Sequence, residues 1–201
     1  SKNTDLTIEG FPRSANSFLE VAIKEVSAKP LLISHHVHAR ANIYRSIKLK
    51  VPCVVLYRNP VDAIVSFMEE SNGRHSNPLV LLNEYNIFYE TMPFNSRYLK
   101  FISFEDVVSN LHKTLLSVFH FANLSINKSV FDDHFNQRVM SKVSEYSVQR
   151  VGFKPAYNSD NKDSLKRNKL RLELRDKILK YETSTAFKKA MDRYWSIKCT
   201  Y

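Results

Sequence analysis

Glycine is scarce in this chain, with three residues among 201. The Walker A loop G-x-x-x-x-G-K-[ST], which cradles phosphates in P-loop NTPases, does not occur. The chain has two cysteines, too few for a disulfide framework and without the spacing of metal ligands. No apolar run approaches the ~20 residues of a membrane span. The first residues contain no apolar segment typical of a signal peptide. The sequence therefore argues against a disulfide scaffold, a zinc module and a membrane-spanning protein.

Composition and charge indicate a globular protein that meets an anionic partner. The chain is 43% hydrophobic and 12% aromatic, and its length predicts one domain over residues 1–201. Residues 1–140 carry 15 basic and 13 acidic side chains, whereas 141–201 carry 15 basic and 7 acidic. Nucleic acid, an acidic surface and a phosphate-rich small molecule all fit this excess of positive charge.

Short apolar runs alternate with helical patterns in the first 120 residues. This order predicts an α/β fold of three layers, a central parallel sheet flanked by helices. The predicted strands are 6–8, 31–33, 53–57 and 99–103, and the predicted helices are 17–26, 39–49, 61–68, 77–89 and one from 104 to 119 that starts at Ser103. Residues 122–160 give no clear pattern apart from a helix cap at 158–160. A charged helix over 164–181 and a last helix over 186–195 follow, so we expect a core over 1–120 and a helical, basic part over 121–201.

The first motif is a tight loop between a strand and a helix, residues 12–18 (PRSANSF). Backbone N–H groups converge at a helix N-terminus, and the partial positive charge there favours phosphate or sulfate. Arg13 adds a cation. The alternative is an ordinary turn in which Ser14 or Asn16 caps the helix.

The second motif, residues 58–66 (RNPVDAIVS), places an arginine at the end of a buried strand and a serine two turns into the next helix. Open parallel sheets bind ligands at this edge. A planar guanidinium suits a phosphate bound by two hydrogen bonds. The alternative is that Arg58 forms an ion pair with Asp62 or Glu69.

Together, in this order, the two motifs resemble the paired signatures of PAPS-dependent sulfotransferases of the bacterial type. The family patterns are P-[KR]-S-G-[TN]-[TS]-[FW] and R-[DN]-P-x-D-x-x-x-S, and residues 104–107 (FEDV) are similar to a third segment, Y-E-D-L. The resemblance covers about residues 6–120 and implies a P-loop-like sulfotransferase architecture. It also implies transfer of the sulfonate group of PAPS to a hydroxyl or amine of an unidentified acceptor, leaving adenosine 3′,5′-bisphosphate.

The resemblance assigns roles to individual residues. Arg13 would contact the bridging and sulfonate oxygens, and Arg58 and Ser66 would bind the 3′-phosphate. The 5′-phosphosulfate would be surrounded by the loop residues Pro12, Arg13, Ser14, Ala15, Asn16 and Ser17. Two departures from the family stand out. Ala15 replaces the usual glycine, and the R-K-G segment for the 3′-phosphate is missing. The basic residues that could substitute for it are Arg150, Lys154, Arg167 and Lys169, of which Arg167 enters the predicted site.

A histidine cluster follows the second predicted strand, in the sequence H-H-V-H over residues 35–38. Sulfonate transfer needs a base for the acceptor proton, and a histidine near neutral pKa suits that task. Aligning Ser34 with the family's K-[TS]-H segment makes His35 the catalytic base, with His36 as the alternative. A metal site and a purely structural histidine are further alternatives, and we expect no metal.

Three other functions were weighed against the sequence: a nucleotide kinase, a nucleic-acid-binding module and a binding protein without turnover. A nucleotide kinase would need the absent Walker residues. A nucleic-acid-binding module would need an RNP, KH or zinc-finger pattern, which the chain lacks, and the basic residues of 162–180 alternate with acidic ones as on a solvated helix face. A protein that keeps the fold and binds without turnover is favoured by Ala15 and the missing R-K-G segment. For partners we expect a small-molecule or glycan acceptor, no nucleic acid and no membrane span. We expect a cytoplasmic enzyme, with a Golgi-type enzyme trimmed of its anchor as the alternative.

Overall fold

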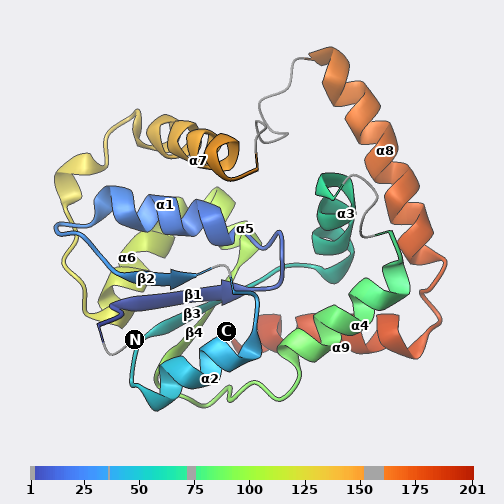
Figure 1. Cartoon of the computed structure of the whole chain (residues 1–201), viewed down its shortest axis with the longest axis horizontal. Helices are drawn as coiled ribbons and strands as arrows, with labels where there is room; N and C mark the ends of the chain where they lie inside the picture. Colours follow the sequence, from blue (N-terminus) through green and yellow to red (C-terminus); the bar gives the residue numbers. More distant parts are fainter. Residues whose placement is uncertain (1–2, 36, 72–75, 152–160) are drawn as a thin grey trace.

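Four parallel strands form the centre of the molecule (Figure 1). The computed structural model describes residues 3–35, 37–71, 76–151 and 161–201, and the side chains of 146–151 and 161–164 are not described. The strands are β1 (Leu6–Gly10), β2 (Ile33–His35), β3 (Cys53–Tyr57) and β4 (Leu99–Ser103). Their order in the sheet is β2-β1-β3-β4, and each neighbouring pair is parallel.

Helices cover both faces of the sheet. They are α1 (Asn16–Val26), α2 (Arg40–Lys48), α3 (Pro60–Glu70), α4 (Pro78–Tyr89), α5 (Phe104–Ser109), α6 (Leu111–Ala122), α7 (Phe135–Val151), α8 (Asn161–Leu179) and α9 (Thr185–Thr200), with a short 3₁₀ helix η1 (Lys128–Val130). In Figure 1, α1 and α7 lie above the sheet, α2 and α9 lie below it, and α8 stands at one end beside α3. The predicted three-layer α/β class is confirmed.

Two hydrophobic cores result from the alternation of side chains along the strands. In β3, Val54 and Leu56 face the core that is shared with α1, α6 and α7. Cys53, Val55 and Tyr57 face the opposite core, to which α3, α4, α8 and α9 contribute. A strand buried on both faces has a continuous apolar sequence, which explains why CVVLY was recognisable as a strand.

The structure corrects two of the predicted elements and adds a helix that was not predicted. The second strand lies at Ile33–His35 rather than 31–33. The helix over 104–119 is two helices, α5 and α6, separated at Asn110. Residues 135–151 form α7, which the sequence did not predict, and the predicted cap at 158–160 lies outside the described residues. Ser103 starts α5 as expected, because its hydroxyl oxygen accepts a hydrogen bond of 3.0 Å from the N–H of Asp106.

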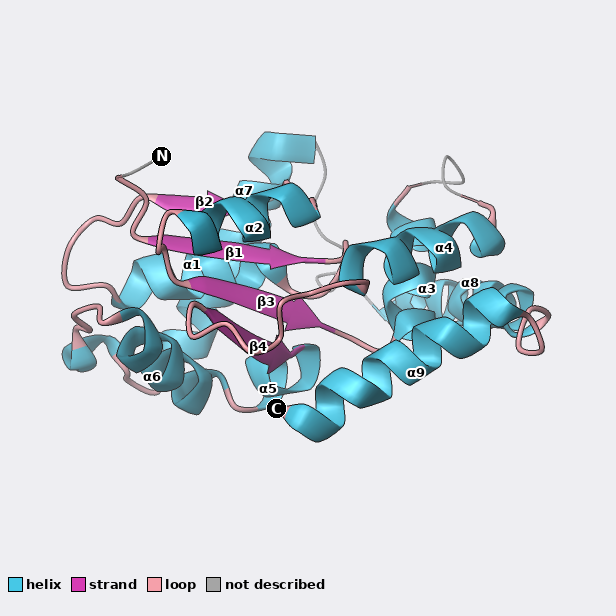
Figure 2. Ribbon diagram, turned by 90° about the horizontal axis from the view of Figure 1, so that it is seen from below, coloured by secondary structure: helices cyan, strands magenta, loops and turns pink. Residues whose placement is uncertain are grey.

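The carboxyl ends of the strands meet at one edge of the sheet, on the side of α3 and α4 (Figure 2). The loops that follow β1, β2 and β3 therefore begin side by side, and they carry the motifs singled out in the sequence. Within the described part of the chain, no helix is long and apolar enough to cross a membrane. Cys53 is buried, Cys199 is exposed, and both are free thiols.

Candidate functional site

The loop from β1 to α1 has an unusual backbone. Arg13 has φ 69° and Ala15 has φ 73°, so two residues other than glycine adopt the left-handed region within three positions. Backbone of alternating handedness turns successive N–H groups toward one point and forms a concave anion site, a nest. Gly10 at the loop entrance is held by close packing, because a Cβ there would lie 2.7 Å from the carbonyl oxygen of Leu56.

Ala15 occupies the conformation that favours glycine. It is the N-cap of α1 with φ 73° and ψ 23°, where a Cβ costs about 1–2 kcal/mol. The alternative of an ordinary capped turn is wrong, because in the described structure no side chain forms a capping hydrogen bond at the start of α1. The first N–H groups of a helix have no partner within it. The start of α1 therefore directs donors and positive potential at the loop.

The polar side chains of this loop face inward. Ser14 is fully buried and Asn16 is 4% exposed, and Asn16 Nδ2 donates to the carbonyl oxygen of Phe11 at 3.3 Å. The N–H of Ser14 donates to the same carbonyl oxygen at 3.3 Å, so an anion in the loop would meet the first backbone N–H groups of α1 rather than these side chains. Pro12 and Ser17 are half-buried.

Arg13 and Arg58 join the two motifs. Arg58 Nη1 donates to the carbonyl oxygen of Arg13 at 2.9 Å. Arg13 Nε donates to Ser66 Oγ at 3.1 Å, and its Nη1 forms an ion pair of 2.6 Å with Glu70. The residues predicted to bind opposite ends of the nucleotide are therefore in mutual contact, although more than 40 positions separate them in the chain.

Arg58 is half-buried, and its guanidinium lies against an aromatic ring. Its guanidinium stacks on the ring of Phe104, 3.7 Å from the ring centroid. Its Nε is buried and has no hydrogen-bond partner among the described residues. Burial lowers the pKa of Arg58; the charge of Asp62 opposes this effect, and the positive charges of Arg171 and Arg13 add to it. An anion beside this guanidinium would supply both the missing hydrogen bond and the missing charge.

The ion pairs considered for Arg58 belong to other residues. Glu69 pairs with Arg167 and lies 3.8 Å from Arg171, and Asp62 pairs with Arg175 at 2.7 Å. Three arginines spaced four apart thus fasten α8 to α3. The arginine predicted to reach the 3′-phosphate, Arg167, is bound to a carboxylate of α3. Lys154 and the side chain of Arg150 lie outside the described residues.

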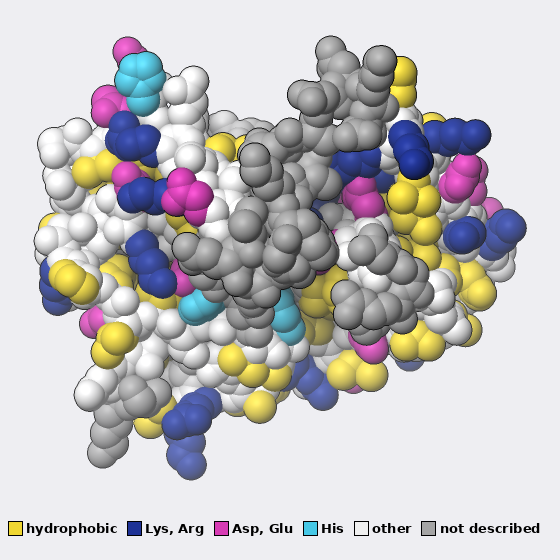
Figure 3. Space-filling model, turned by 45° about the horizontal axis from the view of Figure 1, so that its top comes forward, with side chains coloured by type: hydrophobic (Ala, Val, Ile, Leu, Met, Phe, Trp, Pro, Cys, Tyr) yellow, Lys and Arg dark blue, Asp and Glu magenta, His cyan; other side chains and the backbone are white. Residues whose placement is uncertain are grey.

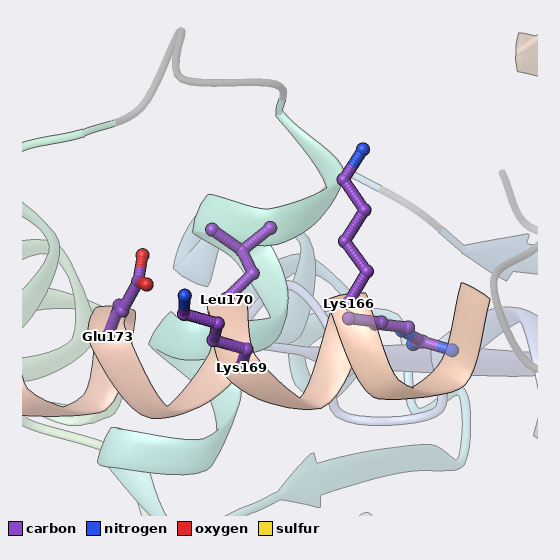
Figure 4. A pocket seen from close by; sticks show the side chains of 5 residues that line it. Lys166, Lys169, Leu170 and Glu173 are labelled. Carbon is purple, nitrogen blue, oxygen red and sulfur yellow. The ribbon is translucent and has the colours of Figure 1, made fainter. Parts of the chain in front are cut away.

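A hollow of about 470 Å³ borders α8 (Figure 4). Its lining comes from α8: Lys166, Arg167, Lys169, Leu170 and Glu173. Lys169, one of the predicted basic residues, lies here, and Figure 3 shows Lys and Arg side chains beside apolar ones on this part of the surface. Some of the basic residues in the C-terminal part thus form ion pairs between α8 and α3, and others line the hollow along α8.

Two tyrosines of α4 hold the loops from the interior. Tyr89 accepts a hydrogen bond from the N–H of Phe11 at 3.2 Å and donates to the carbonyl oxygen of Leu56 at 2.7 Å. Tyr85 donates to the carbonyl oxygen of Arg58 at 2.9 Å. Both tyrosines are fully buried, so they are core residues and not the lining of a cleft. They fix the backbone from which the two arginines extend.

The histidines take separate positions. His35 is the last residue of β2, and its Nδ1 lies 2.9 Å from Glu20 Oε2 on the second turn of α1. His38 Nδ1 lies 2.8 Å from the carbonyl oxygen of Gly10 at the entrance of the loop. His36 lies outside the described residues. Among the residues that the structure describes, no group of three His, Cys, Asp or Glu side chains is placed to hold a metal ion.

The structure adds two residues, His38 and Glu20, to the predicted site. The sequence placed His38 in the histidine cluster without giving it a role. Glu20 was not considered, although a lone acid between Leu19 and Ile23 on the apolar face of a helix was a usable signal, because such an acid needs a buried partner.

Comparison with known proteins finds distant likenesses among solved structures. The chain is similar to mouse sulfotransferase SULT7A1, solved in complex with PAP, with 13% sequence identity and a TM-score of 0.49 over 80% of this chain and 71% of that chain. No family model matches the sequence. No curated protein matches it. The functional proposal below therefore depends on the motifs and contacts of this chain.

Proposed function

We propose that this chain is a sulfotransferase that uses PAPS. The observation that carries the proposal is the meeting of the two motifs, in which Arg58 binds the backbone of Arg13 and Arg13 binds Ser66. Both motifs match the family patterns except at Ala15, and their contact supports a single anion site. The buried Nε of Arg58 has no hydrogen-bond partner in the described part of the chain, and two loop residues have a positive φ. A bound anion would account for both features.

Different groups of the chain would bind the two ends of PAPS and take the acceptor proton. The loop N–H groups and the N-terminus of α1 would hold the 5′-phosphosulfate, with Arg13 as its cation. Arg58 and Ser66 would hold the 3′-phosphate. Bound PAPS would supply the sulfonate: a bond from sulfur to the acceptor oxygen forms, the bond from sulfur to the 5′-phosphate oxygen breaks, and that oxygen keeps the electron pair. His35 would take the acceptor proton.

Arg13 must change partners for this task. In the structure its guanidinium is held by Glu70 and Ser66, and both ends of the ion pair are about one-third exposed. An anion in the loop would compete with Glu70 for Arg13. We infer that Glu70 keeps the arginine oriented before the nucleotide binds.

Calorimetric titration with adenosine 3′,5′-bisphosphate tests the proposal. Arg58→Lys keeps the charge and removes the planar fork, so we expect binding to weaken about 10- to 100-fold. Arg97→Ala is the control, since this exposed arginine contacts Tyr98 away from the motifs. Equal affinity of the wild-type protein and Arg58→Lys would contradict the assigned role of Arg58, and no binding to the wild-type protein would overturn the proposal.

A further inference from the structure

A buried carboxylate lies behind the proposed base. Glu20 is 1% exposed, and its Oε2 is 2.9 Å from Nδ1 of His35, whose side chain is 21% exposed. The two residues come from neighbouring elements, the second turn of α1 and the end of β2. Glu20 thus contacts Nδ1 of His35, the proposed base, from the protein interior.

Glu20 is ionised at neutral pH. Burial raises its pKa, but hydrogen bonds with His35 and Lys24 outweigh burial, so that the net pKa lies below the ordinary value of 4.5. Lys24 contacts the other oxygen, Oε1, at 2.6 Å. A second carboxylate, the buried Glu9 of β1, also interacts with His35 through its charge. Burial raises the pKa of Glu9, and its Oε1 accepts a hydrogen bond of 2.7 Å from Asn42 Nδ2, so Glu20 is the carboxylate in contact with the ring.

The position of the pair suits a role in the proposed reaction. His35 is level with Ile8 in the sheet, two residues before Gly10, where the phosphate loop begins. Glu20 lies one turn after Asn16, the first residue of α1. The pair therefore lies beside the loop and at the carboxyl edge of the sheet.

We propose that Glu20 is a positioning residue that fixes the tautomer of His35. This inference rests on the proposed function. The carboxylate accepts the proton-bearing Nδ1–H, so the other nitrogen, Nε2, is the atom with the lone pair. The proton lost by the acceptor hydroxyl ends on Nε2. The imidazolium that forms is stabilised by the charge of Glu20, which itself gains no proton.

A purely structural pair would have different consequences. If Glu20 only tied β2 to α1, Glu20→Gln would keep the size of the side chain and one hydrogen bond. The turnover rate would then fall only as far as the free energy of unfolding falls. If Glu20 positions the base, the same change removes the charge and lets the ring take either tautomer. Turnover then falls while nucleotide binding is unchanged.

The test begins with ¹⁵N NMR of the imidazole of His35 in the full chain. We expect the wild-type neutral ring to carry its proton on Nδ1, and Glu20→Gln to move a large share of it to Nε2. Glu25→Gln is the matched control, since Glu25 is the next acid on α1 but pairs with Arg138 and Lys142 instead. The same tautomer in the wild-type protein and Glu20→Gln would overturn the proposal.

The kinetic arm uses release of adenosine 3′,5′-bisphosphate from PAPS with a simple phenol as the acceptor. We expect kcat to fall about 100-fold in Glu20→Gln, with KM for PAPS unchanged and Glu20→Asp partly restoring the rate. A fall in kcat no larger than that of Glu25→Gln would contradict the role of Glu20.

The two proposals fail separately. If the bisphosphate does not bind the wild-type chain, the proposed function fails, whatever the NMR experiment shows. If the bisphosphate binds but the tautomer of His35 does not depend on Glu20, the positioning role alone fails.

Discussion

Replacing Ala15 by glycine should stabilise the protein. Ala15 has φ 73° and ψ 23°, a conformation in which a Cβ lies too close to the neighbouring carbonyl oxygen. Removing the Cβ relieves about 1–2 kcal/mol of strain. Glycine loses more chain freedom on folding, which costs about 0.5–1 kcal/mol. The expected net gain is therefore about 0.5–1 kcal/mol.

An alanine-to-glycine substitution at a helical position should instead lower the free energy of unfolding. Ala41 is exposed in the first turn of α2, where the backbone is helical and alanine is favourable. Ala41→Gly should destabilise the protein by up to about 1 kcal/mol. The pair of variants thus separates backbone strain at position 15 from the general cost of glycine.

Thermal and urea unfolding measure the difference. For a chain of this length, 1 kcal/mol shifts Tm by about 2–4 °C. We expect Tm to rise by about 2 °C in Ala15→Gly and to fall by a similar amount in Ala41→Gly. A fall in both variants would refute the left-handed conformation of Ala15, and with it the nest on which the anion site depends.

Two further variants test the surroundings of the loop. Glu70→Gln should strengthen binding of adenosine 3′,5′-bisphosphate about 2- to 5-fold in calorimetric titration, because Arg13 loses the carboxylate that competes with the ligand. Glu84→Gln, an equal charge change at an exposed site of α4, is the control, and an equal effect of both variants would refute the competition. Tyr89→Phe should lower the free energy of unfolding by about 1–3 kcal/mol, because two buried backbone groups lose the hydroxyl that pairs with them. A loss below about 0.5 kcal/mol in urea unfolding would contradict this account of α4.

The elements that the sequence predicted well are those buried on both sides. Residues 53–57 and 99–103 are strands with the predicted bounds, since runs of apolar and β-branched residues leave few alternatives. The second strand was placed two residues early because Leu31 and Leu32 are apolar. Leu32 is 61% exposed, so its hydrophobic side chain was a misleading signal.

The unpredicted helix α7 shows the limit of periodicity. Among its described residues, the buried apolar ones are Phe135, Val139 and Val143, which form a narrow stripe with one apolar residue per turn. Most of the remaining residues are polar, so the pattern is weak. Packing against α1, including the ion pair of Arg138 with Glu25, stabilises the helix beyond its own sequence.

At the candidate site, the sequence identified the residue types but not their partners. The sequence showed that Ala15 replaces the family's glycine, and the structure shows that this residue has a positive φ. The ion pair of Arg13 with Glu70 and the contact of His35 with Glu20 join positions that no local pattern relates. Arg167, which was predicted to bind phosphate, forms an ion pair with Glu69, because the docking of α8 on α3 decides which carboxylate it meets. Its binding of phosphate stays a prediction.

Selectivity for the 3′-phosphate tests the central claim most directly. The wild-type chain should be titrated with adenosine 3′,5′-bisphosphate, AMP and ATP under the same salt conditions. If Arg58 and Ser66 hold a 3′-phosphate beside the loop, the bisphosphate binds at least about 10-fold more tightly than AMP, as expected for one added charged hydrogen-bonded contact. Equal affinity for AMP and the bisphosphate, or preference for ATP, would contradict the account.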